Sequence, residues 1–385
     1  MLGWGMLETL HPEYNCVVIH YGEITLKRSR RGKFERILRE NLEEHVGVGV
    51  RRLQGRLVID LEPGMDVAGL LERIGKVFGV VWYAPAVKVS SLEEARDILL
   101  RILSRTGARS MKIMVKRSDK RFPKTSIEVA RELGREVSEK LGLRVDLKNP
   151  EQTIIIEITE DGIYVSLIKL RGPGGLPLNA SGRVLGLYSG GAGSALACWF
   201  MMKRGCRVDL LHVHDEESGE KLLRSEIMYN VEKLLEYALR MRIYMIPLKP
   251  ILGMFEDYQG DEKSTVKAAF ILRLGEEVAK LKGYPGLVLG SRLEDLNVLE
   301  GLLEMLSMRS LPVHMPLIAF TGEEVAKRCS MLGFRVTQDL WEHKRYPAIP
   351  DPAELWRKLE APVKRALEGL ETYDLRLGIE PKRVS

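Results

Sequence analysis

The chain has 385 residues, 59 lysines and arginines against 53 aspartates and glutamates, and a formal net charge of +6. This length is too great for one compact core, so two or three domains are expected, and the positive balance favours an anionic partner such as nucleic acid, an acidic membrane or a phosphate ligand. The four scattered cysteines include no C-x-x-C pair, which argues against a disulfide framework and a zinc knuckle and fits a reducing cytoplasm.

The start of the chain, Met1 to Glu8, lacks the basic opening of a signal peptide, and two glycines and a glutamate interrupt its apolar run. No targeting segment is therefore expected. Asparagine and glutamine together number only ten while charged residues reach 29%, a bias typical of heat-adapted proteins.

The first 76 residues are predicted to form a small α+β unit. Apolar periodicity predicts strands at Cys16–His20 and Arg56–Leu61, and helices at Gly32–His45 and Val67–Lys76. The loop and helical turn after the first strand are strongly basic, which fits either a solvated surface or a contact with a phosphate backbone. The candidate RNA-binding residues of this first basic segment are Lys27, Arg28, Arg30, Arg31 and Lys33.

Residues 77–170 are predicted to form a second α/β unit. Its expected elements are Phe78–Pro85, Leu92–Leu103, Lys112–Val115, Ser126–Leu141, Thr153–Thr159 and Ile163–Leu170. The run Ile154–Ile156 is too continuously apolar for an exposed edge strand.

The positive charge of the chain is concentrated in this second predicted domain. Lysine and arginine exceed aspartate and glutamate by 8 between Arg101 and Lys148, more than the surplus of the whole chain. Phe122 lies within a basic turn and is expected to anchor that turn rather than stack on a base. The two basic segments can converge on one polyanion. The candidate RNA-binding residues here are Lys116, Arg117, Lys120, Arg121 and Lys124, which form the second basic segment at 116–124, and Lys148 beyond it.

Residues 171–183, with four glycines and two prolines, are the predicted linker to a third domain at 184–385. Strands and helices alternate there, which predicts a doubly wound parallel sheet. The expected elements are Val184–Tyr188, Ala195–Arg204, Arg207–Val213, Lys221–Leu239, Ile243–Ile246, Thr265–Leu281, Gly286–Leu289 and Leu296–Leu306. An amphipathic helix with Asp351 as its N-cap should follow, and the closing polar residues are expected to fray.

The uncharged run from Val184 to Met202 is long enough to raise the question of a membrane span. Its four glycines instead favour a strand, a glycine turn at Ser189–Gly193 and a helix. Small residues at such a turn let backbone NH groups approach a phosphate, although the spacing alone equally fits an ordinary strand-to-helix turn. Ligands of parallel sheets bind at the carboxyl ends of strands, where Ser189, His212 and Gly290 fall.

The segment Ser189-Gly-Gly-Ala-Gly-Ser194 resembles the SGGxDS loop of ATP-pyrophosphatase (PP-loop) domains. Its surroundings are similar to those of the ThiI-type tRNA 4-thiouridine synthetases. The segments that carry this likeness are Gly172–Pro177, Ser181–Gly182, Met202–Gly205, Tyr21–Lys27, Lys116–Arg117, Lys120–Pro123, Thr125–Glu128 and Val145–Pro150.

The resemblance implies a ferredoxin-like α+β unit, a THUMP RNA-binding domain and a PP-loop domain. It implies binding to the acceptor end of tRNA, and ATP with Mg²⁺ where the site is competent. A sulfur-donor protein and a second copy of the chain are candidate partners, whereas a membrane is not. The residues that it implies for ATP binding are Leu187, Tyr188, Ser189, Gly190, Gly191, Gly193, Ser194, His212, Val213 and Gly290.

The chain departs from the family pattern at the groups that perform the chemistry. The aspartate of the loop is Gly193, the paired arginines fall on Ala268 and Ala269, and a glutamine falls on Leu299. The segment that carries the family's cysteine corresponds to Asp339–Arg345, which has none. A thiolate is the nucleophile in sulfur transfer, so no catalytic residue and no metal ligand is predicted, and Cys329 is expected to be an ordinary buried thiol.

The favoured interpretation is a tRNA-binding member of this family with incomplete adenylating and sulfur-transfer groups. The alternative is an active sulfurtransferase that adenylates a tRNA uridine and takes sulfur from an external donor. A third possibility, an amidotransferase acting on a small molecule, has no evident use for two basic segments.

Overall fold

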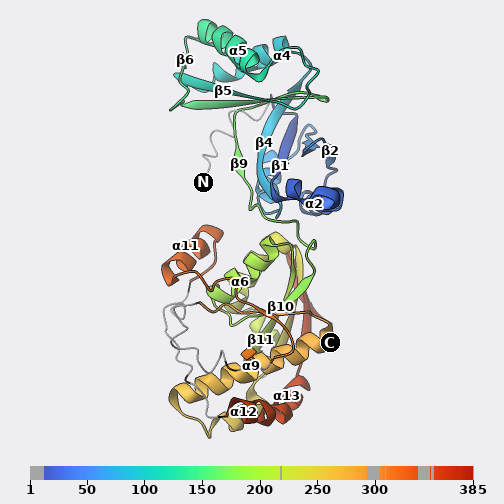
Figure 1. The fold of residues 1–385 in the computed structure, drawn as a ribbon, viewed down its shortest axis with the longest axis vertical. Helices are drawn as coiled ribbons and strands as arrows, with labels where there is room; N and C mark the ends of the chain where they lie inside the picture. Colours follow the sequence, from blue (N-terminus) through green and yellow to red (C-terminus); the bar gives the residue numbers. More distant parts are fainter. Residues whose placement is uncertain are drawn as a thin grey trace. The chain divides into compact units, whose positions relative to one another are not determined.

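The computed structural model describes residues 13–216, 219–292, 304, 306–307, 309–336, 347 and 351–384. The chain forms two compact units, residues 1–177 and 178–385, which we describe separately (Figure 1). No helix among the described residues is long and apolar enough to cross a membrane. The predicted start at Met1 to Glu8 and most of the predicted helix Leu296–Leu306 lie outside these ranges.

A single nine-stranded sheet runs through the first unit, in the order β2-β3-β1-β4-β8-β7-β5-β6 with β9 paired to β4. The long strand β4 pairs with β1 along most of its length and with β8 only at its end, so the first two predicted domains share one sheet. The run Ile154–Ile156, which was predicted not to form an edge strand, lies in β7 and pairs with β5 on one side and β8 on the other. The strands are β1 (Cys16–Tyr21), β2 (Arg51–Leu53), β3 (Arg56–Asp60), β4 (Val80–Val89), β5 (Ser110–Arg117), β6 (Arg144–Val145), β7 (Gln152–Thr159), β8 (Gly162–Ser166) and β9 (Leu170–Arg171).

The helices of the first unit are α2 (Arg31–Val46), α3 (Val67–Ile74), α4 (Leu92–Leu103) and α5 (Ser126–Leu141), and a 3₁₀ helix, η2 (Glu23–Arg30), precedes α2. Their apolar faces and one face of the sheet form a continuous core. The alternate residues of β1, β3, β4 and β8 form a small second cluster. Thr125 and Glu128 form a capping box that fixes the start of α5.

The predicted linker at 171–183 is hydrogen-bonded at its beginning. The Gly172 NH donates to the Val81 carbonyl over 3.0 Å, and the Gly79 NH donates to the Gly174 carbonyl over 2.8 Å. These bonds attach the beginning of the segment to β4, and the division between the two units follows Pro177.

The second unit contains a seven-stranded sheet in the order β14-β13-β10-β11-β12-β15-β16. The five strands from β14 to β12 are parallel, whereas β15 and β16 are antiparallel. The strands are β10 (Arg183–Leu187), β11 (Arg207–His214), β12 (Arg240–Pro247), β13 (Leu287–Val288), β14 (Val313–His314), β15 (Glu371–Arg376) and β16 (Ile379–Arg383).

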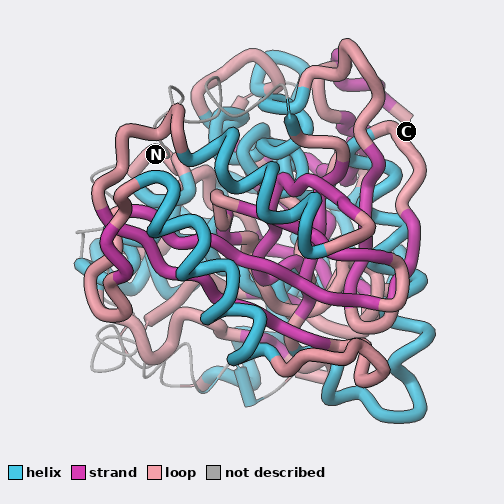
Figure 2. Tube along the Cα trace, turned by 90° about the horizontal axis from the view of Figure 1, so that it is seen from above, coloured by secondary structure: helices cyan, strands magenta, loops and turns pink. Residues whose placement is uncertain are grey.

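Helices cover both faces of this parallel sheet. A Cβ added to Gly186 of β10 would lie 2.5 Å from the Cys198 sulfur of α6, and a Cβ added to Gly275 of α9 would lie 2.7 Å from the next strand residue, Leu187. Successive strand residues point to opposite faces, so α6 and α9 lie on opposite sides and the doubly wound prediction is confirmed. Figure 2 shows helices beside the strands. The described helices are α6 (Ala192–Lys203), α7 (Gly219–Leu222), α8 (Ile227–Ala238), η3 (Lys249–Phe255), α9 (Gly260–Lys282), α11 (Gly322–Leu332), α12 (Pro352–Lys358) and α13 (Glu360–Leu367).

Three predictions for the second unit are wrong. The single helix expected at Lys221–Leu239 is two helices, and the Ser225 hydroxyl donates to the Leu222 carbonyl in the turn between them. The closing residues do not fray but form the hairpin β15–β16, with Tyr373 buried and Gly378 at φ +70° in the turn. Asp351 caps α12 as predicted, but the single helix expected to continue through Leu367 is two helices, α12 and α13, separated at Leu359.

Candidate functional site

The glycine-rich loop connects β10 to α6, which begins at Ala192 rather than at the predicted Ala195. The Ser194 hydroxyl donates to the Gly191 carbonyl at 2.9 Å and accepts from the Ser189 NH at 3.3 Å. The two serine hydroxyls lie 3.2 Å apart. These bonds within the loop fix its shape, so binding an anion does not require the loop to become ordered.

The beginning of α6 leaves backbone donors free. Its N-cap, Gly191, has no side chain, and within the described structure no acceptor is found for the NH groups of Ala192, Gly193 and Ser194. Gly190 has φ +94°, in the left-handed region that favours glycine. Free NH groups and the positive end of a helix dipole are the features that bind phosphate at strand-to-helix turns.

Gly290, after β13, packs directly on this helix terminus. A Cβ at this position would lie 3.0 Å from the Ser194 nitrogen and Cα atoms and 3.1 Å from the Gly193 carbonyl carbon. These neighbours are backbone atoms, which cannot rotate away as a side chain can. Residue 290 must therefore be glycine for the segment after β13 to approach the loop this closely.

His212 is buried near the carboxyl end of β11, and its Nδ1 lies 2.8 Å from the Tyr188 carbonyl. Its Nε2 is buried and has no partner among the described residues. Burial lowers the pKa of His212, so the imidazole is neutral near pH 7. The Tyr188 hydroxyl donates to the Ile227 carbonyl at 2.6 Å, so that phenol supports the loop.

All the predicted ATP-binding residues follow or end three neighbouring parallel strands, because β10 pairs with both β11 and β13. Leu187 ends β10 and packs into the core on the α9 side, with Val213 of β11 packed against the same core. His212 lies in β11 next to Val213, and the other residues lie in the loop, at the beginning of α6 or after β13. The structure therefore brings the predicted residues together at one edge of the sheet.

The described residues contain no group of three or more His, Cys, Asp or Glu side chains that could hold a metal ion. Gly193 offers no carboxylate, and Glu226, next to the residue that Tyr188 contacts, pairs with Arg335 at 2.9 Å. Ala269 is fully buried in the core, and the Lys267 ammonium lies 5.9 Å from the Phe255 ring centroid. The positions Leu299 and Asp339–Arg345 lie outside the described residues.

The four cysteines of the chain all lie in described segments and all are buried. Burial raises the pKa of Cys16, Cys198 and Cys329 to about 12. The Cys329 sulfur lies 3.8 Å from the Ala192 carbonyl, under the beginning of α6. A thiol with such a pKa is not a nucleophile near neutral pH, so the expected packing role of Cys329 agrees with its surroundings.

In the first basic segment, at 27–33, some cations are held within the protein. Arg31 donates to Glu35 at 2.6 Å and to the Tyr21 hydroxyl at 3.1 Å. The Lys27 ammonium lies 5.5 Å from the centroid of the Phe34 ring. Arg31 therefore has a structural role in addition to its charge. The side chain of Arg28 lies outside the described structure.

The second basic segment, at 116–124, is braced internally. Arg117 donates to the carbonyl oxygens of Phe122 and Lys124 at 2.9 and 3.1 Å. Arg121 pairs with Asp119, and Lys124 pairs with Glu132 at 2.6 Å. Phe122 is half-buried and packs against the core of the unit, as expected for an anchor.

The two basic segments border the same β-turn, which joins β2 to β3. A Cβ added to Gly55 of this turn would lie 3.9 Å from the Arg31 guanidinium, and the next residue, Arg56, donates to the Ser118 hydroxyl at 3.2 Å. Side chains of both segments can therefore reach one polyanion. The predicted cations that are exposed and make no ion pair with any described residue are Arg30, Lys33, Lys116, Lys120 and Lys148.

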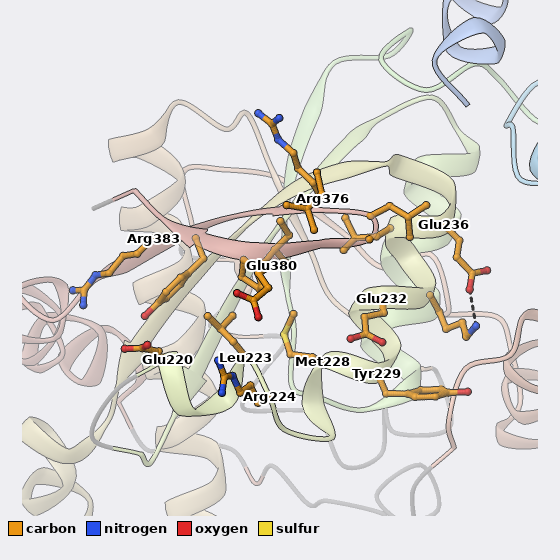
Figure 3. A pocket seen from close by; sticks show the side chains of 18 residues that line it. Glu220, Leu223, Arg224, Met228, Tyr229, Glu232, Glu236, Arg376, Glu380 and Arg383 are labelled. Atoms are coloured by element: carbon orange, nitrogen blue, oxygen red, sulfur yellow. Dashed lines mark hydrogen bonds and ion pairs between the residues drawn. The ribbon is translucent and has the colours of Figure 1, made fainter. Parts of the chain in front are cut away.

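A separate groove lies in the second unit between α8 and the hairpin β15–β16 (Figure 3). Its volume is about 900 Å³, and both acidic and basic side chains line it, including Glu220, Arg224, Arg376 and Glu380. It includes no residue of the glycine-rich loop. The groove is therefore distinct from the candidate nucleotide site.

Three segments of the chain match known protein families. The family model "Thiamine biosynthesis protein (ThiI)" matches residues 179–340, the ThiI ferredoxin-like domain matches 16–84, and the THUMP domain matches 92–168. Probable tRNA sulfurtransferases of Brevibacillus brevis and Alkaliphilus oremlandii are 30% and 33% identical to the chain. The matches cover 81% of this chain in both cases, and 81% and 82% of the relatives.

The chain belongs to the tRNA sulfurtransferase (ThiI) family. A solved 4-thiouridine synthetase in complex with RNA and bound ATP shares the fold, with a TM-score of 0.79, 22% identity and coverage of 94% of this chain and 100% of the other. A Pyrococcus horikoshii protein is 26% identical with a TM-score of 0.64, covering 83% of this chain and 100% of the other. Family membership confirms the resemblance and the fold class predicted from the sequence.

Proposed function

We propose that this member of the tRNA sulfurtransferase family binds tRNA through residues 1–170 and acts in tRNA 4-thiouridine modification. The observation that carries the proposal is the meeting of two basic segments at the β2–β3 turn. Lysine and arginine side chains without carboxylate partners bind a phosphate backbone by releasing its counterions. A ligand the size of tRNA can engage both segments at once.

The third predicted domain, residues 184–385 after a linker at 171–183, binds ATP at the glycine-rich loop. The free NH groups at the beginning of α6 fit phosphate oxygens, and His212 Nε2 is available to the nucleotide. Gly193 supplies no carboxylate for a directly bound Mg²⁺, and the described residues contain no cluster of acidic side chains that could hold one. Any Mg²⁺ that accompanies ATP is held by phosphates and water.

The groups present favour binding over complete catalysis. Adenylation requires stabilisation of the negative charge that develops on the departing pyrophosphate, and Ala268 and Ala269 supply no cation for it. Sulfur transfer requires a thiolate, whereas the cysteines of this chain are buried. Thiolation with this chain therefore needs a sulfur nucleophile on another molecule.

The test combines tRNA binding with ATP–pyrophosphate exchange. We expect purified chain to bind tRNA with an affinity that falls steeply as salt rises, and to show no exchange with tRNA and Mg²⁺. Absence of salt-dependent tRNA binding would contradict the proposal. Exchange activity, together with 4-thiouridine that disappears when the gene is deleted and returns with it, would establish the active enzyme instead.

A further inference from the structure

One edge of the sheet in the second unit carries an arginine on each of four neighbouring strands, β10, β11, β12 and β15. The parallel strands begin at this edge and the antiparallel strand β15 ends there. The register pairs Arg183 with Arg207 and Arg240 with Arg376, and the register of β11 and β12 brings Arg207 level with Arg240. Because neighbouring strands lie about 4.8 Å apart, these four residues, which we call the arginine row, span about 14 Å.

The four side chains of the arginine row leave the same face of the sheet, because residues opposite one another in neighbouring strands point to the same side. Leu187 of β10 faces α9, and Arg183 lies four residues earlier in the same strand, so the row is on the α9 face. The Arg183 guanidinium donates to the carbonyl oxygens of Lys282 and Gly283 at 3.1 and 2.9 Å, where α9 ends. The row therefore begins beside the end of α9.

Most of the positive charge of the row is not neutralised within the protein. Three of its side chains are exposed and Arg207 is partly exposed. The bonds of Arg183 go to neutral carbonyls, and Arg376 makes no ion pair with any described residue. Arg207 Nε lies 3.6 Å from the carboxylate of Asp209, which also accepts from the Tyr284 hydroxyl at 2.7 Å.

Further cations border the row. Lys282 at the end of α9 and Lys382 of β16 make no ion pair within the described part of the chain. In the register of the hairpin, Lys382 lies opposite Asp374, and that carboxylate pairs with Arg242 at 2.8 Å. Cations therefore outnumber carboxylates along this edge.

A level row of arginines fits a partner with several negative charges in succession. Guanidinium groups match phosphate oxygens with two parallel hydrogen bonds, and the phosphates of a nucleic acid repeat along its backbone. The centre of a protein–protein interface is usually depleted of charged residues, whereas arginines form the centre of this surface. The glycine-rich loop follows the opposite end of β10, so the row is distinct from the candidate ATP site.

We propose that the arginine row binds the phosphate backbone of tRNA. The proposal rests on the proposed tRNA-binding function and adds an RNA contact in the second unit, separate from the two basic segments of the first. Phosphate contacts carry no sequence information, so the row contributes affinity rather than selectivity for particular bases.

The test measures tRNA binding by the full chain over a salt series, with fluorescence anisotropy of labelled tRNA. Arg376→Ala should lower the slope of log K against log salt by about 0.9 and weaken binding roughly eightfold near 0.1 M salt, because one phosphate contact is lost. Combining it with Arg240→Ala should lower the slope by about 1.8. Arg376→Lys keeps the charge and should retain most of the slope.

Arg357→Ala is the matched control, because it removes an exposed arginine of α12 that makes no ion pair with a described residue. This change should leave the slope and the affinity unaltered, and thermal unfolding of each variant should show that the fold is retained. A loss in Arg376→Lys as large as that in Arg376→Ala would show that packing rather than charge is responsible, and would overturn the proposal.

Two other results would overturn the assignment of the row. One is an unchanged slope in the double variant while Lys33→Ala and Lys120→Ala still weaken binding, which would leave the proposed function intact. The other is binding of polyglutamate as tight as that of tRNA and equally weakened by Arg376→Ala, which would assign the row to an acidic polypeptide. If the unmodified chain does not bind tRNA, the proposed function itself fails, and the assignment of the row fails with it.

Discussion

The convergence of the two basic segments can be tested with one lysine from each. Lys33 and Lys120 are exposed and make no ion pair within the described structure, so their replacement by alanine breaks no internal contact found there. Each phosphate contact contributes about 0.9 to the slope of log K against log salt, which corresponds to roughly eightfold in affinity near 0.1 M salt. The double variant should therefore lose about 1.8 in slope and bind tRNA about 60-fold more weakly at that salt concentration.

Fluorescence anisotropy with labelled tRNA over a salt series measures both quantities. Lys140→Ala is the matched control, because it removes the same charge from a part of α5 outside both basic segments. If the slope of the double variant equals that of either single variant, the two lysines do not contact the same RNA. If Lys140→Ala has the same effect as Lys33→Ala, general charge rather than a defined surface accounts for binding.

Four further outcomes are expected. Gly290→Ala should weaken ATP binding by isothermal titration and lower stability by about 1 to 3 kcal/mol, because its Cβ meets the α6 backbone; Gly253→Ala, with no atom within 4 Å of the added Cβ, should do neither. Burial lowers the pKa of His212, so the contribution of this residue to the free energy of unfolding is complete above about pH 6.5. Below that pH the free energy of unfolding should fall by up to about 1.4 kcal/mol per pH unit. Urea unfolding of His212→Gln should show a smaller fall than the unmodified chain. Iodoacetamide followed by mass spectrometry should label the four cysteines only after unfolding, and labelling of the native chain would contradict their burial. Gly193→Asp should not create ATP–pyrophosphate exchange, and recovery of exchange from this change alone would show that the other departures do not matter.

The periodicity of apolar residues predicts helices well, because a helix is stabilised largely by residues that are close together in the sequence. The boundaries of α4 and α5 agree with those expected, because both helices have clear apolar faces and side-chain caps. The hairpin β15–β16 was missed because its pairing is non-local: β15 pairs with β12, more than a hundred residues earlier. Its alternating polar residues resemble a terminal tail unless that partner is known.

The same distinction applies to the candidate sites. The glycine-rich loop is continuous in sequence, so its position and its backbone donors were predictable. Which basic side chains are free was not, because the contacts of Arg31 with Tyr21 and of Lys124 with Glu132 become evident only in the fold.

The two kinds of site differ in their sensitivity to substitution. The loop binds through backbone NH groups, which depend on the left-handed Gly190, on Gly290 and on the beginning of α6 rather than on particular side chains. The absence of a carboxylate at Gly193 leaves those donors in place, so the proposed phosphate binding does not depend on a carboxylate at that position. ATP binding and ATP turnover are therefore separable properties of this chain, and measuring one does not establish the other.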